Sequence, residues 1–257
     1  APPRQAHIQA SAHDPRTPAW QNWFTAIVVP LIFFAVIASL CRQSRSNETR
    51  CAESRKRKWN TSFDELIDKF PSQPAHVWAL VKEAQRSNAE APVILMMLAN
   101  VGNKAMLDRF AVATAEMLAS NRWPPYSVIT VNASQLANTS NAGELLQTTL
   151  LQGKPFVAVI SDVHLMSMNL VSILHSFFDE MSPYSGNIFL FTLTSPIAVE
   201  SLPRDKHERI AESILDKAWK DKLHLGYRSS LVARLTGNAV AIWPDRPVEK
   251  QLKRTQA

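Results

Sequence analysis

Residues 93–104 read VILMMLANVGNK and hold the feature that decides the fold, seven consecutive apolar residues followed at once by a polar turn. An unbroken apolar run of this length, bounded by turn residues, predicts a strand that is buried on both faces. Similar runs follow at 127–131, 156–160 and 187–193, and segments with a helical spacing of apolar residues separate them. This alternation predicts a mostly parallel sheet covered by helices on both faces, which is a three-layer α/β fold.

Helices and one further strand are predicted on either side of these runs. Ser62 and Glu65 have the spacing of a capping box, which predicts that a short helix opens there and stops at Pro71. Pro74 suits the first turn of a second helix that runs to about Arg86. A helix of about 16 residues is expected after the turn at 100–103. Other helices are expected near 144–151, 168–181, 205–223 and 229–235, and a last strand at 239–243.

The spacing of the glycines excludes several classes of enzyme. The chain has 6 glycines, and no two of them stand five positions apart. A Walker A phosphate loop needs that spacing before its lysine, and a Rossmann fingerprint needs three glycines within six positions. The G-x-S-x-G turn of α/β-hydrolases is absent as well. The sequence therefore predicts neither a nucleotide cofactor nor a hydrolase of that class.

Metal and disulfide chemistry have little support in the sequence. The only cysteines are Cys41 and Cys51, too few for a cysteine-based zinc site or a disulfide scaffold. These two thiols could be free, lipidated or joined between chains. His164 and His175 stand eleven positions apart with no matching carboxylates, so we expect ordinary side chains there. We expect no bound metal.

The net charge of +6 is confined to the first part of the chain. Residues 1–58 hold nine Lys or Arg against three acidic residues, and the remaining 199 residues hold 19 of each sign. A neutral folded part has no basic face for a phosphate backbone, so we expect no nucleic-acid partner.

A membrane-spanning helix is predicted at 23–41. No charged residue occurs from 17 to 41, and residues 23–40, WFTAIVVPLIFFAVIASL, are almost wholly apolar. A run of about 18 residues can cross the hydrocarbon core, and Trp20 and Trp23 suit its interface. The sequence then divides into an N-terminal segment 1–22, the helix, a charged linker 42–58 and a folded domain 59–257.

The orientation in the membrane stays open on the sequence. Seven Lys or Arg follow the span and two precede it, which by the positive-inside rule favours a cytoplasmic domain. However, four N-x-[ST] sequons on the domain side favour a lumen. The candidate glycosylation sites are Asn47, Asn60, Asn132 and Asn138.

The residues where an active site is expected lack a catalytic set. In parallel sheets, ligands bind at the carboxyl ends of the strands. Lys104 follows the first strand where a phosphate-loop lysine would stand, and Asp162 follows the third where a Walker B acid would stand. Val163 replaces the water-activating glutamate. We expect Lys104 to be a solvated residue of the first helical turn and Asp162 a helix cap or loop carboxylate. The order of parts resembles an AAA+ nucleotidase whose nucleotide chemistry has been removed.

Two segments carry a closer resemblance. The opening FDELIDKFPSQPAHVW at 63–78 and the ending SSLVARLTGNAVAIWPDRPVEK at 229–250, with the predicted span, linker and AAA+-like core, resemble the torsin-interacting proteins. This family comprises lamina-associated polypeptide 1 and its luminal-domain-like relative. The similarity covers about residues 60–250. Family members close with a short helix bearing an arginine and then an apolar run ending in proline, which match 231–236 and 239–244 here.

The resemblance implies a single-pass type II glycoprotein of the nuclear envelope or endoplasmic reticulum membrane, with its C-terminal domain in the lumen. Such a domain lacks ATPase activity of its own, binds ATP-bound torsin and supplies an arginine finger, which matches Arg234. Val232 departs from the family's aromatic residue at that position. Arg228 is the alternative arginine if the register differs. A region preceding this sequence would contact the lamina or cytoplasmic proteins.

Two other classes of function stay open on the sequence. One is a non-catalytic tether at the nuclear envelope or endoplasmic reticulum membrane. The other is an enzyme that uses Asp162 and Lys104 on a substrate outside the known motifs, although the missing phosphate loop argues against it.

Overall fold

The computed structural model describes residues 53–245 except 55, 88–90, 123–125, 137–138, 140, 151–154 and 179–183, and at 176 the backbone alone. The chain divides into two compact units, Ala1–Lys56 and Arg57–Ala257, and nearly all of the described residues belong to the second. The predicted span 23–41, the segment 1–22 and most of the linker lie outside the described residues. Where the chain is described, none of its helices has both the length and the apolar character needed to cross a bilayer.

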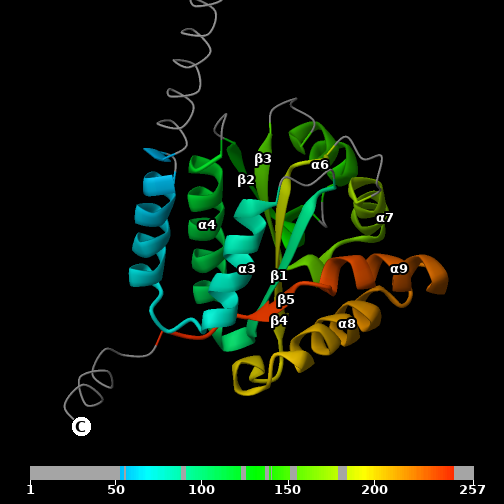
Figure 1. Cartoon of the computed structure of the whole chain (residues 1–257). Helices are drawn as coiled ribbons and strands as arrows, with labels where there is room; N and C mark the ends of the chain where they lie inside the picture. Colours follow the sequence, from blue (N-terminus) through cyan, green and yellow to red (C-terminus); the bar gives the residue numbers. More distant parts are fainter. Residues whose placement is uncertain are drawn as a thin grey trace, which may run out of the picture. The chain divides into compact units, whose positions relative to one another are not determined.

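A five-stranded sheet forms the centre of the second unit, and all of its strand pairs are parallel (Figure 1). Its order, β2-β3-β4-β1-β5, differs from the Rossmann and flavodoxin orders. The predicted strands are confirmed with small shifts of their ends, and the last is shorter than expected. The strands are β1 (Val93–Asn100), β2 (Ser127–Asn132), β3 (Phe156–Ser161), β4 (Ile188–Ser195) and β5 (Ala239–Ala241).

Helices connect the strands as the periodicity of the sequence predicts. The unit begins with helical residues 57–69. The later helices are α3 (Ala75–Arg86), α4 (Lys104–Ser120), α5 (Ala133–Leu136), α6 (Ala142–Leu150), α7 (Met168–Phe177), α8 (Asp205–Trp219) and α9 (Leu225–Thr236). Short 3₁₀ turns come after three strands: η2 (Val101–Asn103), η3 (Val163–Leu165) and η4 (Val199–Ser201).

Alternation along the strands divides the core into two halves. In β1, Leu95, Met97 and Ala99 pack with the first helix, α3 and α4, whereas Met96 and Leu98 pack with α6 to α9. Figure 1 shows the same two layers of helices on either side of the strands. Because successive side chains of a strand point to opposite faces, an unbroken apolar strand needs cover on both. The three-layer α/β prediction is confirmed.

The first helix begins earlier than the capping-box prediction. Residues 57–61 are already helical, and Thr61 Oγ1 donates to the Arg57 carbonyl at 3.1 Å, so Ser62 lies inside the helix. The ring of Trp59 stacks on Phe63 with centroids 5.2 Å apart. This contact, together with basic residues that favour helix, extends the helix into the predicted linker. The prediction of a helix start at Ser62 was wrong for this reason.

One glutamine joins the two ends of the unit. The Gln73 side chain donates from Nε2 to the Trp243 carbonyl at 2.7 Å and accepts from the Trp243 N–H at 2.9 Å. Gln73 is buried, and it lies between the first helix and α3, whereas Trp243 follows β5. The amide therefore pairs with a strand-like backbone as a neighbouring strand would, across 170 positions of sequence.

We expect Gln73→Ala to lower the free energy of unfolding by about 1–3 kcal/mol, because it removes two hydrogen bonds between a buried side chain and the partly buried backbone of Trp243. Urea denaturation of the purified chain measures this change. Gln85→Ala is the matched control, since Gln85 makes one bond of 3.3 Å to the Asn121 carbonyl. Equal losses for the two variants would contradict the role given to Gln73.

A buried histidine ties α8 to β5. His207 Nδ1 accepts from the Ala241 N–H at 3.2 Å, and Nε2 lies 3.3 Å from the Leu202 carbonyl. Both contacts are satisfied by the neutral ring with its proton on Nε2. Burial lowers the pKa of His207, and burial also lowers the pKa of the neighbouring His76.

We expect the unit to lose stability as the pH falls below about 6.5, the ordinary histidine value. The folded state keeps His207 neutral there while the unfolded chain takes up the proton, so protons favour unfolding. The loss is at most about 1.4 kcal/mol per pH unit for each such histidine. Denaturation at pH 7.5 and 5.5 measures it, and His207→Gln should flatten the dependence whereas exposed His224→Gln should not. An unchanged slope in His207→Gln would contradict this account.

Candidate functional site

The carboxyl ends of the central strands meet at one edge of the sheet, as the parallel topology requires. Asn100 at the end of β1 pairs in register with Ser195 at the end of β4. Asp162 follows β3, the strand next to β4. Ligands of open α/β sheets bind at this edge, so the predicted site residues are placed where a ligand would be held.

The turn after β1 is too short to cradle a phosphate. Asn100 uses its side chain to accept from the Gly102 N–H at 2.9 Å, and this bond closes the single 3₁₀ turn η2. Lys104 is already the first residue of α4. A phosphate loop needs several successive N–H groups that point inward at the ligand, whereas this turn uses one of them internally.

Lys104 and Asp162 contact each other directly. Lys104 Nζ lies 2.7 Å from Asp162 Oδ2 and 3.0 Å from Asp108 Oδ2. The Asp162 side chain is 6% exposed and that of Lys104 is 39% exposed. Partial burial alone would lower the pKa of Lys104, but hydrogen bonds to Asp162 and Asp108 outweigh it, and the pKa is raised. The ammonium of Lys104 therefore stays charged.

This geometry corrects the expectation for Lys104 and decides between the two for Asp162. Lys104 is half-buried and shared between two carboxylates, so it is not simply a solvated residue of the first turn. Asp162 lies in the turn between β3 and η3 and makes no capping hydrogen bond with its side chain, so it is the predicted loop carboxylate and not a helix cap. The sequence could not reveal the pairing because the two residues are 58 positions apart.

The backbone of Asp162 is held in an uncommon conformation. Its φ of 56° lies in the left-handed region, and it is the only non-glycine residue of the described chain with a positive φ. Asp is among the residues that tolerate this region best. Its N–H donates to Thr192 Oγ1 of β4 at 3.2 Å, in a fully buried place. A bond from a neighbouring strand thus fixes the carboxylate that meets Lys104.

The remaining polar groups of this edge form no catalytic constellation. His164 has its pKa lowered chiefly by burial, and its Nδ1 has no partner among the described residues. Ser161, Asp162 and His164 follow one another along the chain, and none of the described hydrogen bonds joins them side chain to side chain. In the part of the chain that the structure describes, no three potential metal ligands gather.

Exposed large apolar side chains occur on three turns at this edge, one after each of β1, β3 and β4. Two others are the first residues of α7 and α9. Exposed large apolar residues favour contact with other proteins when they form a patch. Sequence reasoning missed them, although a valine between Asn100 and Gly102 in a polar turn was a usable signal. They are Val101, Leu165, Ile197, Met168 and Leu225.

The two candidate arginines of α9 differ sharply. Arg234 lies in the last turn of α9 with an exposed side chain. Arg228 is 7% exposed, and it donates from Nε to Asp216 Oδ1 at 2.6 Å and from an Nη to the Lys220 carbonyl at 2.9 Å. Arg228 therefore joins α9 to the end of α8.

The sequons fall in different surroundings. Asn60 is exposed on the first helix. Asn132 ends β2, is half-buried, and accepts with Oδ1 from the Ser134 N–H at 3.0 Å and the Ser134 hydroxyl at 2.6 Å. Asn47 and Asn138 lie outside the described residues, as do both cysteines.

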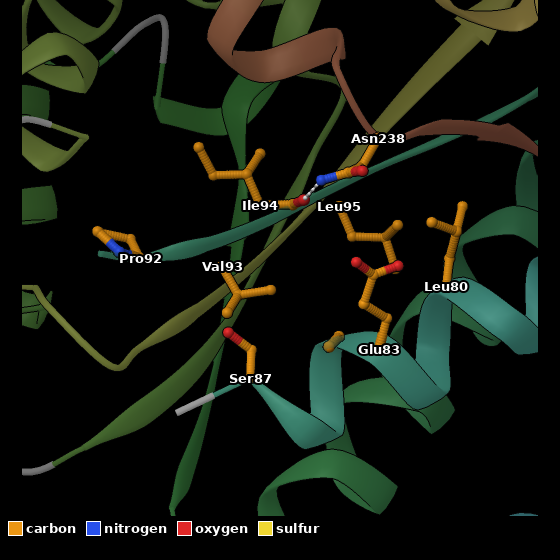
Figure 2. Close-up of a pocket in the computed structure, with 9 residues that line it drawn as sticks. Leu80, Glu83, Ser87, Pro92, Val93, Ile94, Leu95 and Asn238 are labelled. Carbon is orange, nitrogen blue, oxygen red and sulfur yellow. Dashed lines mark hydrogen bonds between the residues drawn. The ribbon is translucent and has the colours of Figure 1, made fainter. Parts of the chain in front are cut away.

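A cavity of about 220 Å³ lies at the opposite end of β1 from Lys104 (Figure 2). It is bounded by α3, by the start of β1 and by Asn238, whose Nδ2 donates to the Ile94 carbonyl at 3.3 Å. Its charged lining residue is Glu83. The cavity brings together none of the residues singled out from the sequence.

Comparison with known proteins gives little beyond the fold. No protein-family model matches the chain, and no curated protein matches it. Among solved structures, one chain of the structure of Drosophila ORC bound to GC-rich DNA and Cdc6 aligns over 79% of this chain and 85% of that chain, with 10% identity and a TM-score of 0.25. A likeness of this degree assigns no activity to this chain. The structure itself shows a five-stranded parallel sheet between two layers of helices, and the likeness to AAA+ nucleotidases stays a prediction from the sequence. The torsin-interacting family stays a prediction from the sequence.

We expect Lys104→Met to lower the free energy of unfolding by about 1–3 kcal/mol, because the Asp162 carboxylate keeps its burial and loses its partner. Adding Asp162→Asn should recover part of the loss. Arg109→Met is the control, since its pair with Asp245 at 3.1 Å is exposed and contributes at most about 1 kcal/mol. Urea denaturation compares the variants, and no difference between Lys104→Met and the control would contradict the buried pair.

Proposed function

We propose that this chain is a membrane-anchored luminal cofactor of a torsin ATPase, which binds ATP-bound torsin and stimulates hydrolysis by supplying Arg234 as an arginine finger. The domain would lie in the lumen of the nuclear envelope or endoplasmic reticulum. The observation that carries the proposal is the exposed position of Arg234 on a helix that is itself fixed to the core.

The support beneath Arg234 is rigid. Leu231 and Leu235 flank it on α9 and are fully buried, and α9 leads directly into β5 of the sheet. A finger needs such support, because the guanidinium must reach the γ-phosphate without much loss of side-chain and backbone freedom. Its planar fork, always charged, offsets the charge that spreads over the phosphate oxygens in the transition state.

The alternative finger has less support. Arg228 is buried, and both its carboxylate partner and its carbonyl partner lie at the end of α8. To reach another protein, Arg228 would have to break its 2.6 Å hydrogen bond to Asp216 and leave an empty space between α8 and α9. Its place in the fold favours a structural role, so the finger is assigned to Arg234.

The residues at the carboxyl ends of the strands favour an ATPase activator over an ATPase. The lysine and the aspartate that would hold phosphate and magnesium in a nucleotidase neutralise each other at 2.7 Å. The turn η2 lacks the cradle of N–H groups. We therefore assign no nucleotide to this chain itself, and the nucleotide of the reaction belongs to the partner.

A tether without catalytic effect is the second candidate. The exposed apolar residues on the carboxyl edge, such as Val101, Leu165 and Ile197, favour binding of another protein, and they act independently of Arg234. Activation and tethering make opposite predictions for a variant that removes only the guanidinium.

We expect the whole chain to raise ATP turnover by a torsin and Arg234→Ala to abolish the increase, since fingers supply about 10³–10⁵ in rate. Arg209→Ala, which removes another exposed arginine from α8, should keep it. Turnover is measured together with binding to ATP-loaded torsin. Retained binding with lost stimulation fits the finger, whereas full stimulation by Arg234→Ala, or none by the unaltered chain, would overturn the activator proposal.

A further inference from the structure

The two outer strands of the sheet, β5 and β2, differ in how the side that has no neighbouring strand is protected. β5 is short, and the chain after it is held by Gln73 through Trp243. β2 stands at the other edge with six residues, 127–132. An edge strand leaves a row of backbone N–H and C=O groups without a ladder partner, and proteins usually shorten, bend or charge such an edge.

The backbone groups of β2 that face outward can be assigned from its register. The Ser127 N–H donates to the Pro155 carbonyl at 3.1 Å, and β2 pairs with β3 one residue to one residue from Ser127 to Asn132. In a parallel ladder alternate residues bond to the same neighbour. The backbone groups of residues 127, 129 and 131 therefore face β3, and those of Val128, Thr130 and Asn132 face away from the sheet.

Within its own described residues, β2 has no feature that protects an edge strand. Its sequence, SVITVN, has no charge, proline or glycine, and its one-to-one register excludes a bulge. Four consecutive residues, 128–131, are β-branched, which favours pairing. Val128 and Thr130 are exposed, whereas Ile129 and Val131 pack against the core.

We propose that β2 pairs antiparallel with β2 of a second copy of this chain, so that two sheets join across a twofold axis. A register centred on Thr130 sets Thr130 opposite Thr130 and Val128 opposite Asn132, and it pairs all three outward-facing residues of each strand. Two identical strands meet this requirement because an isologous contact uses the same patch twice. The absence of charge means that no like charges oppose each other, and threonines directly opposite are a favourable cross-strand pair.

Pairing through β2 uses neither Arg234 nor the Lys104–Asp162 pair, so the variants that test it differ from those that test the proposed function. It has one condition. Asn132 is both a sequon residue and the end of β2, so a glycan there would occupy the contact. The test therefore uses whole chain made without N-glycans.

Cysteine pairing tests the register. In a chain with Cys41→Ser and Cys51→Ser, Thr130→Cys should form a disulfide-linked dimer on mild oxidation, because Cα atoms of opposite residues lie about 5.5 Å apart. Val128→Cys alone should not, whereas a mixture of Val128→Cys and Asn132→Cys chains should. Thr148→Cys, exposed on α6, gives the background. Linkage of Thr130→Cys no greater than that of Thr148→Cys overturns the proposal.

Molar mass in solution provides the second test. We expect the unaltered chain to sediment as a dimer at high concentration, and Thr130→Lys to lose the dimer while keeping its thermal stability, because two lysines then oppose each other on the axis. Exposed Thr148→Lys should remain dimeric. An unaltered chain that stays monomeric, a Thr130→Lys chain that stays dimeric, or a β2 that pairs with a different protein instead overturns self-pairing.

Discussion

The constraint on which the structure depends is the burial of β1 and β4 on both faces. Their side chains alternate between two cores, so each strand needs a layer of helices above and below it and a parallel neighbour on either side. Helices must then return every connection to the same end of the sheet. As a result, the turns after β1, β3 and β4 lie together at the carboxyl ends of the strands. Polar residues such as Lys104 and Asp162 lie in or beside these turns.

At that edge the protein has the positions of a nucleotide site without its chemistry. The 2.7 Å contact between Lys104 and Asp162 satisfies two charges that a nucleotidase would leave for phosphate and magnesium. Thr192 fixes the strained backbone of Asp162, and Asn100 closes the turn that would otherwise open around a phosphate. Around this ion pair the loops expose apolar side chains. Such side chains favour contact with another protein, as the proposed function requires.

Most of the fold could be predicted from the sequence, because apolar runs and helical spacing are local. The helix α3 is one example, since it begins after Pro74 and ends at Arg86 as predicted. The start of the first helix could not be, since it depends on the contact of Trp59 with Phe63. The pairing of Lys104 with Asp162, the burial of Arg228 and the clasp of Gln73 on Trp243 are distant contacts that no local pattern encodes. At the carboxyl ends of the strands, the sequence placed Lys104 after β1 and Asp162 after β3 and could not show that the two side chains contact each other.

The two hydrogen bonds between Gln73 and Trp243 have a consequence for biosynthesis. Together with the pairing of β1 with β5, they join the beginning of the unit to its end. A chain emerging from the ribosome exposes one side of β1 until residues near 243 have been made. The sheet therefore closes only after the residues of β5 have left the exit tunnel, and until then one edge of its most apolar strand is unpaired.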